Sequence, residues 1–369
     1  MKRQNYNSSI LVIWSASTPA LASMFLKGKE FEYFYPVSKK TIKNKPVKYF
    51  FRLMQSLFYN SSRDKNILYR MDYYELKRKI DKGQYKTVIG FHSATSKPYL
   101  KYVSQKTSAR VLAIMPSRLE EFDFFKNTSD NIDKNINYWV FGHRDAELMI
   151  KNGASKERIV VAGSPYSYLF LKSKIYDLNS SNNITFDICI VSQIIDDFFF
   201  VDKLTENRKK GFRTHKKILE EINLLDQRMS GIRVVVALRP QSKGGKYLKN
   251  EIDFFKTRLN VKELVFVEND QESFSTYRTM LASKIVLSGH STAGFEAYGF
   301  HKIAWFYRPY IRYENNIIFS TESCKKGSLA SDLFKVLANI DNYKKNLKFL
   351  KYEFNDVQPK FYDSLIESL

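Results

Sequence analysis

The chain has 369 residues, of which 44% are hydrophobic and 15% aromatic. A composition this apolar excludes a disordered chain, and the length favours two domains over a single core. The formal net charge of +22 favours anionic partners, although biased codon usage explains such an excess equally well. The two cysteines, Cys189 and Cys324, lack the spacing of a metal site, and Cys189 lies in an apolar run typical of a buried thiol.

In the first half of the chain, short apolar β-branched runs alternate with longer amphipathic stretches. This alternation is typical of a parallel sheet with crossover helices. The less periodic, strongly basic region 31–85 is predicted to form helices that decorate this domain, and Gly153 closes a helix predicted at 144–152. The apolar stretch at the N-terminus is too short for a signal-peptide core, and no run of about 18 apolar residues predicts a membrane span. Strands are predicted at 10–14, 86–90, 110–114, 138–141 and 158–162.

A polar stretch at 179–183 is predicted to be a linker, and the strand–helix pattern restarts after it. The second half therefore repeats the architecture of the first, an open α/β domain. In the last segment, 343–354 has the spacing of a basic amphipathic helix, either an ordinary surface helix or one that lies on a membrane. Strands are predicted at 186–191, 232–238, 263–267, 284–287 and 302–306. The predicted domains are 1–178 and 184–340, followed by a helical tail at 341–369.

Candidate binding residues directly follow the predicted strands, because ligands of open α/β sheets bind beyond the carboxyl ends of the strands and at helix N-termini. After the strand at 284–287, the segment Ser-Gly-His-Ser-Thr-Ala-Gly-Phe-Glu-Ala (288–297) turns into a helical pattern. Its hydroxyls and free N–H groups suit a nucleotide phosphate, its glycines allow close approach, and its glutamate suits a ribose hydroxyl. Simple helix capping is the alternative. The candidates are Gly289, His290, Ser291, Thr292, Gly294 and Glu296.

Two other predicted strands also end in polar residues. Arg239 follows the strand at 232–238, where it either holds a phosphate or carboxylate bidentately or lies in an ordinary solvated turn. Ser192 and Gln193 end the strand at 186–191, and Asp197 follows in the turn, within reach of a base, ribose or sugar. Without a third carboxylate nearby, these residues do not predict a metal site.

Taken in order, the turn from Gln193 to Asp197, the Leu-Arg-Pro at 238–240 and the 288–297 segment resemble a known series. They are similar to the donor domain of bacterial capsule and lipopolysaccharide Kdo transferases and their sialyltransferase-like relatives. The resemblance is most specific in Gly-Phe-Glu-Ala with the hydroxyl pair. It implies the GT-B fold, in which two Rossmann-like α/β domains face each other across a cleft. The family's His-Pro is Arg239-Pro240 here, and because Arg cannot shuttle protons at neutral pH, the donor stays open.

This resemblance implies an inverting glycosyltransferase that needs no metal and no cofactor. The donor would be a CMP-activated 2-keto sugar acid of the Kdo, sialic, pseudaminic or legionaminic type, and the acceptor a hydroxyl of a bacterial surface glycan or lipid-linked glycan. We expect a cytoplasmic protein, consistent with its few cysteines, and peripheral contact with the inner-membrane surface is left open. A side chain of the first domain would act as general base. The candidates are His92, Glu120, Glu121 and Asp123.

Three other interpretations remain. One is a CDP-glycerol or CDP-ribitol phosphotransferase, which has a similar donor domain to the Kdo transferases and also uses a cytidine nucleotide. A nucleic-acid-binding protein would fit the basic composition, but the basic residues are dispersed and no known binding motif occurs, so no nucleic acid is expected. A catalytically inert partner of a membrane glycan assembly complex would fit the arginine at the histidine position.

Overall fold

The computed structural model divides the chain into two compact units. Unit 1 comprises Met1–Leu169 and Asn355–Leu369, and unit 2 comprises Phe170–Phe354. The division therefore falls inside one helix, α8 (Pro165–Ser173). The residues that the structure describes are 10–14, 19–36, 67–83, 85–91, 96–115, 132–173, 184–194, 206–239, 246–270, 272–289, 291–300, 302–306, 329–340 and 357–369.

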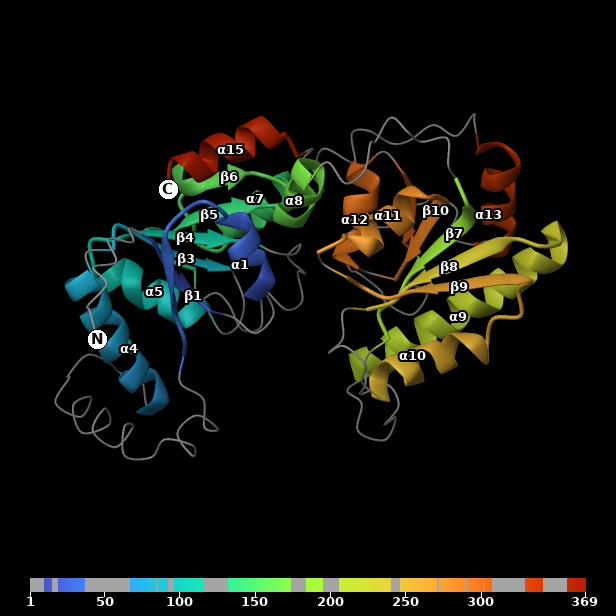
Figure 1. Ribbon diagram of the computed structural model, residues 1–369, viewed down its shortest axis with the longest axis horizontal. Helices are drawn as coiled ribbons and strands as arrows, with labels where there is room; N and C mark the ends of the chain where they lie inside the picture. Colours follow the sequence, from blue (N-terminus) through green and yellow to red (C-terminus); the bar gives the residue numbers. More distant parts are fainter. Residues whose placement is uncertain are drawn as a thin grey trace. The chain divides into compact units, whose positions relative to one another are not determined.

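Unit 1 contains a six-stranded sheet in which each pair of neighbouring strands is parallel, with the order β2-β1-β3-β4-β5-β6 (Figure 1). The strands β1 and β3 are buried along their whole length, which is why they read as continuous apolar runs in the sequence. The strands of unit 1 are β1 (Ile10–Ile13), β2 (Phe31–Phe34), β3 (Thr87–Phe91), β4 (Arg110–Ile114), β5 (Asn137–Val140) and β6 (Ile159–Val161).

The helices of unit 1 begin and end where the local sequence favours it. Proline opens three of its helices, a position where its missing N–H has no intrahelical partner. Gly153 adopts φ +101° after α7, the left-handed conformation that the sequence predicts there. The described helices of this unit are α1 (Pro19–Phe25), α4 (Ile67–Gly83), α5 (Lys97–Lys106), α7 (His143–Lys151), the first part of α8, and α15 (Pro359–Glu367).

The prediction that region 31–85 is helical is wrong at its start. Phe31 to Phe34 form β2, the edge strand, which pairs in parallel with β1 and places Phe31 opposite Ile10. Glu32 accepts hydrogen bonds from Lys79 of α4 and from Tyr85, so this strand is held by residues about fifty positions later in the chain. A four-residue strand gives too little periodicity to be distinguished from a helix, although its aromatic residues favour a strand.

The last helix, α15, belongs to unit 1 and lies beside β6 in Figure 1. Its Tyr362 stacks on Tyr168 at 4.7 Å between ring centroids and meets Phe25 and Trp139 edge-on. The Tyr362 hydroxyl donates a hydrogen bond of 2.9 Å to the carbonyl of Gly163. Of the predicted tail at 341–369, the structure therefore describes the final helix, and the amphipathic segment 343–354 lies outside the described residues.

Unit 2 contains a five-stranded parallel sheet with the order β11-β10-β7-β8-β9. All five strands occur where the sequence predicts them. They are β7 (Phe186–Val191), β8 (Arg233–Ala237), β9 (Glu263–Val267), β10 (Ser283–Ser288) and β11 (Ile303–Phe306). The described helices are α9 (Glu206–Met229), α10 (Lys246–Lys256), α11 (Ser275–Leu281), α12 (Thr292–Gly299) and α13 (Leu329–Ala338).

The core of unit 2 forms where β7, β8 and β10 pack against α9, α10 and α13. Ile188, Val234 and Ile285, one from each strand, are fully buried in this cluster. Cys189 is also fully buried, and burial raises the pKa of its thiol to about 12, which confirms the predicted buried thiol. Close packing of strand side chains against the helices favours a single arrangement of the short strands in this sheet.

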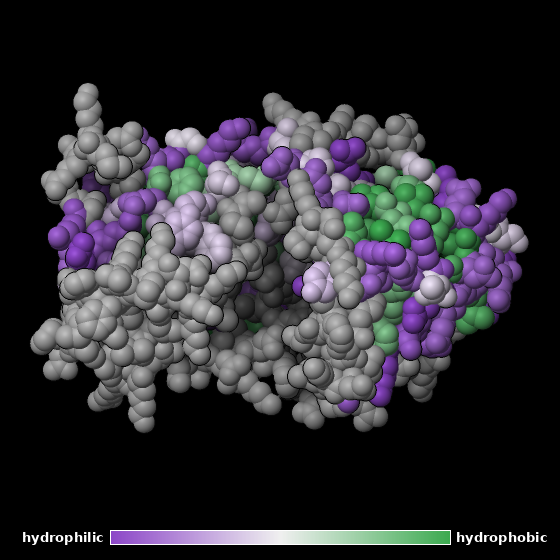
Figure 2. All heavy atoms as spheres, turned by 60° about the horizontal axis from the view of Figure 1, so that its bottom comes forward, coloured by the Kyte–Doolittle hydropathy of each residue, from purple (hydrophilic) through white to green (hydrophobic). Residues whose placement is uncertain are grey.

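Figure 2 shows hydrophilic side chains on both units and a hydrophobic area on unit 2, at the right of the picture. Within the described ranges, no helix is both long and apolar enough to cross a membrane. The same residues contain no group of three or more His, Cys, Asp or Glu side chains that could hold a metal ion.

Candidate functional site

The turn between β10 and α12 has the geometry of a capped helix start. Ser288 ends β10, and α12 begins at Thr292, as predicted. The backbone N–H of Ser291 donates to Ser288 Oγ at 3.0 Å, and Ser291 Oγ in turn accepts from the N–H of Ala293 at 3.3 Å. Ser291 therefore caps the helix, which was the alternative interpretation. A hydroxyl that accepts a hydrogen bond keeps its own proton for donation, so capping and anion binding are compatible.

Gly289 lies against the end of the neighbouring strand. A Cβ at this position would come within 2.8 Å of Gln193 Oε1 and within 3.8 Å of His215 Cε1. The predicted close approach at Gly289 therefore exists, but its partner is a side chain of the protein. As a result, the residues after β7 and after β10 form one packed group.

The end of β7 is held by α9. The N–H of Gln193 donates to His215 Nε2 at 3.2 Å, so this ring nitrogen acts as a hydrogen-bond acceptor. Thr214, the preceding residue of α9, is 2% exposed, and its hydroxyl has no hydrogen-bond partner among the described residues. Sequence reasoning missed both residues, because only the fold brings the third turn of α9 to the end of β7.

A buried carboxylate from α10 holds the ends of two strands. Glu251 is fully buried, and its Oε1 accepts hydrogen bonds from Ser192 Oγ and, at 3.1 Å, from the N–H of Arg239. The sequence contains a signal for it: Glu251 lies three residues after Leu248 and four before Phe255, at a core position of an amphipathic helix. An acid at such a position indicates a buried polar contact.

Arg239 follows β8 after one residue, Leu238, and it is exposed while its backbone N–H is held by Glu251. The planar guanidinium of an arginine can hold a phosphate or carboxylate bidentately, and it loses less side-chain entropy per hydrogen bond than a lysine does.

Glu296, the candidate acceptor for a ribose hydroxyl, is buried in the structure. Its side chain is 3% exposed, and Oε2 accepts a hydrogen bond of 2.9 Å from the hydroxyl of Tyr277 on α11. The carboxylate therefore ties α12 to α11, and a ribose hydroxyl would have to share it with Tyr277. Gly294, in the first turn of α12, is buried, and its N–H donates to the carbonyl of Ser291 at 3.0 Å.

Several predicted site residues lie outside the described part of the chain, and their roles stay predictions. All four candidates for the general base belong to this group. The residues are His92, Glu120, Glu121, Asp123, Asp197 and His290.

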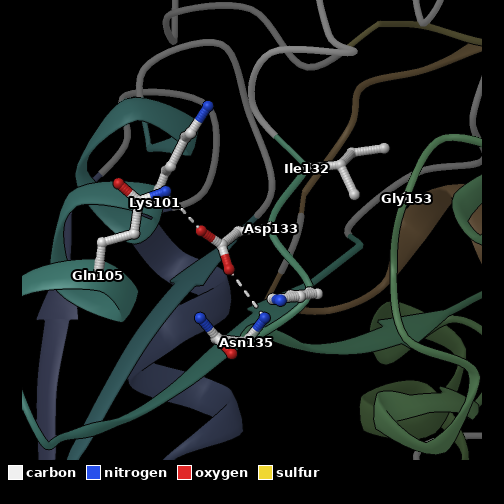
Figure 3. Close-up of a pocket in the computed structure, with 7 residues that line it drawn as sticks. Lys101, Gln105, Ile132, Asp133, Asn135 and Gly153 are labelled. Atoms are coloured by element: carbon white, nitrogen blue, oxygen red, sulfur yellow. Dashed lines mark hydrogen bonds between the residues drawn. The ribbon is translucent and has the colours of Figure 1, made fainter.

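A shallow pocket of about 350 Å³ occurs in unit 1, and none of its lining residues is a predicted site residue (Figure 3). Its lining includes Lys101 and Gln105 at the end of α5 and the loop before β5, so it lies at the amino ends of the strands. Asp133 in this pocket accepts hydrogen bonds from Gln105 Nε2 at 2.7 Å and from the N–H of Asn135 at 2.8 Å. These contacts satisfy the carboxylate within the fold, and ligands of parallel sheets bind at the opposite edge.

Solved structures share the fold of this chain. The UDP-GlcNAc 2-epimerase from Neisseria meningitidis bound to UDP-GlcNAc is 10% identical, with a TM-score of 0.54 over 97% of this chain and 98% of that one. The S. aureus MnaA–UDP co-structure is 9% identical, with a TM-score of 0.53 over 97% and 94%. The wall teichoic acid polymerase TagF is 12% identical, with a TM-score of 0.52 over 100% and 89%. No protein-family model matches the sequence, and no curated protein matches it.

At identities this low, the similarity identifies the fold and leaves the chemistry to the residues. The two parallel sheets, each flanked by helices, match the architecture of these structures over nearly the whole chain. The chain therefore has the α/β GT-B fold that the sequence predicts.

Proposed function

We propose that the chain is a nucleotide-sugar-dependent glycosyltransferase whose donor nucleotide binds to unit 2 at the ends of β7, β8 and β10. The observation that carries this proposal is the β10–α12 turn, where the hydroxyls of Ser291 and Thr292 stand at a helix start and are only half-buried. A helix N-terminus attracts a phosphate through its free N–H groups and its dipole. Two structures of the same fold hold UDP-GlcNAc or UDP, which supports a nucleotide in this fold.

For the donor, we propose a CMP-linked 2-keto sugar acid, on the resemblance of the 288–297 segment to Kdo and sialic acid transferases. Such a donor is anionic at its phosphate and its carboxylate, and the exposed Arg239 and the net charge of +22 support it. The acceptor would be a hydroxyl of a surface glycan, with His92, Glu120, Glu121 or Asp123 as the base.

A second candidate is a transferase that builds an anionic polymer from a CDP-linked polyol. The similarity to the wall teichoic acid polymerase TagF favours it, since that structure matches the whole length of this chain. The same anion-binding turn would bind the phosphate of either donor. Both donors carry cytidine, so the base of the nucleotide distinguishes these two proposals from a UDP-dependent enzyme.

A thermal-shift panel with CMP, CDP, UDP and GDP tests the proposal. Ligand at 100 times its Kd stabilises the folded state by about 2.7 kcal/mol, which is a clear shift in Tm. Stabilisation by CMP supports the keto-acid donor, and stabilisation by CDP supports the polyol donor. A shift with UDP alone would overturn the cytidine assignment, and no shift with any nucleotide would overturn the proposed function.

The double substitution Ser291→Ala with Thr292→Ala tests the site itself. We expect it to weaken nucleotide binding by about tenfold or more, because hydrogen bonds to a charged group contribute about 1.5–3 kcal/mol. The lost cap alone costs about 1 kcal/mol of folding stability.

Ser275→Ala is the matched control, because Ser275 Oγ accepts from the N–H of Asp270 at the start of α11. It should lower the Tm by a comparable amount and leave nucleotide affinity unchanged. Titration calorimetry measures both variants, and wild-type affinity in the double variant would contradict the assignment of this turn.

A further inference from the structure

The ends of β7 and β8 lie next to each other in the sheet. The two strands pair in parallel up to Val191 and Ala237, and the N–H of Ser192 extends the ladder with a bond of 3.0 Å to the carbonyl of Ala237. Beyond this point the N–H of Leu238 still bonds to the carbonyl of Val267 on β9 at 2.9 Å, and the regular strand pairing ends before Gln193 and Arg239. The conformation of both ends therefore depends on other groups.

One oxygen atom supplies that constraint. Glu251 Oε1 accepts from Ser192 Oγ at the end of β7 and from the N–H of Arg239 at the end of β8. Ser192 Oγ also accepts from the N–H of Ile194 at 3.3 Å, which extends the constraint past Gln193. A single buried carboxylate thus connects both segments that carry candidate binding residues.

Burying a carboxylate is unfavourable unless hydrogen bonds compensate for its lost hydration. Glu251 is fully buried, and Phe255, four residues further along the same helix, belongs to the apolar core of unit 2. An apolar residue would fill this place at a lower desolvation cost, but it would leave the N–H of Arg239 and the hydroxyl of Ser192 without this acceptor. The hydrogen bonds that Glu251 accepts from Ser192 and Arg239 therefore account for a carboxylate at this buried position.

We propose that Glu251 is a positioning residue for the nucleotide site of unit 2. It fixes the backbone that carries the exposed Arg239 side chain, and it fixes the Ser192–Gln193 turn beside it. It would act through these groups, since its own side chain is fully buried and shielded from solvent. This inference rests on the proposed function and adds to it the residue that shapes the site.

The test compares three substitutions at Glu251 by titration calorimetry, using whichever of CMP, CDP, UDP and GDP stabilises the wild type most. Glu251→Ala removes the acceptor, and Glu251→Asp withdraws it by one methylene; both should weaken binding by about tenfold or more. Glu251→Gln keeps an oxygen in the Oε1 position for both donors, so its affinity should stay within about threefold of wild type. Asp253→Asn, an exposed carboxylate on the same helix, is the matched control and should bind like wild type.

Amide hydrogen exchange supplies a readout that does not depend on a ligand. In Glu251→Ala and Glu251→Asp, exchange should accelerate at Arg239 and Ile194, while Glu251→Gln should keep wild-type protection. Should Glu251→Ala fail to fold, the Asp and Gln variants make the same comparison. Wild-type affinity in Glu251→Asp, or an equal loss in Glu251→Gln, would overturn the positioning role and leave the proposed function standing. If the wild type binds none of the four nucleotides, the proposed function fails, and this inference fails with it.

Discussion

At the scale of single residues, a neighbouring side chain, and not the backbone conformation, explains why position 289 favours glycine. Its φ angle is not among the positive ones, so glycine is not required there for conformational reasons. The space is what excludes a side chain, because a Cβ would come within 2.8 Å of Gln193 Oε1. A substitution here therefore acts on Gln193, a candidate donor-binding residue.

We expect Gly289→Ala to displace the Gln193 side chain and to weaken nucleotide binding by about threefold to tenfold. Because Oε1 is the end of a flexible side chain, it can move at a cost of about 1 kcal/mol or less in unfolding free energy. Titration calorimetry and chemical denaturation measure the two effects.

Gly153→Ala in unit 1 is the control for Gly289→Ala. Gly153 has φ +101° and open space around it, so an alanine is strained there by about 1–2 kcal/mol without touching the proposed site. It should lose stability and keep wild-type affinity. Equal affinities in Gly289→Ala and wild type would show that Gln193 takes no part in binding.

At the scale of elements, an ionic cluster joins three strands of unit 2. Asp187 on β7 accepts from Lys284 Nζ of β10 at 2.8 Å and from the N–H of Arg233 of β8 at 2.9 Å. Partial burial raises the pKa of Asp187, but the hydrogen bonds and charges of Lys284 and Arg233 outweigh it, so the pKa lies below its usual value. The three central strands are therefore joined by charge near their amino ends as well as by backbone bonds.

We expect Asp187→Asn to lower the unfolding free energy by about 1 kcal/mol at neutral pH. A carboxylate with a lowered folded-state pKa stabilises the fold above its unfolded pKa of about 3.9, and this contribution is lost as the pH falls through the folded value. The gap between the variant and wild type should thus be constant from about pH 7 to 5 and shrink below about pH 4. Urea denaturation at several pH values measures the gap, with Asp253→Asn as the exposed control; a gap independent of pH down to 3 would contradict the role of the charge.

At the scale of the whole molecule, the end of the chain completes the first unit. The aromatic rings of Phe25, Trp139, Tyr168 and Tyr362 meet in one cluster although they are spread over most of the sequence. Tyr168 also donates to Asp363 at 2.6 Å, and Lys29 and Arg110 donate to carbonyls of the last three residues. Residues from α15 therefore complete the packing of unit 1.

Two substitutions at Tyr362 separate the ring from its hydroxyl. Tyr362→Phe removes the bond to the Gly163 carbonyl and should cost about 1 kcal/mol, whereas Tyr362→Ala also opens a cavity and should cost about 3–5 kcal/mol. Thermal denaturation measures both. Phe361→Ala is the control, because Phe361 is exposed on the same helix and should change stability little. Equal stability of Tyr362→Ala and wild type would show that α15 is not part of the folded core of unit 1.

The sequence by itself determined that an open α/β domain occurs twice along the chain. Parallel strands that are buried on both faces read as continuous apolar runs, as β7 and β10 illustrate. Ten of the eleven strands in the described part of the chain could be located from local composition. It also determined where candidate ligand groups stand, because residues after parallel strands share one edge. Ser291, Thr292 and Arg239 could be named for this reason alone.

Only the tertiary structure decided which groups these residues meet. β2 gains its strand conformation from pairing with β1, which four residues of local pattern do not encode. At the end of β7, Ser192 bonds to Glu251 of α10 and Gln193 bonds to His215 of α9. Glu296 accepts a hydrogen bond from Tyr277 of α11. Such contacts join positions far apart in the chain, where side-chain packing and burial decide the outcome and no local preference records it.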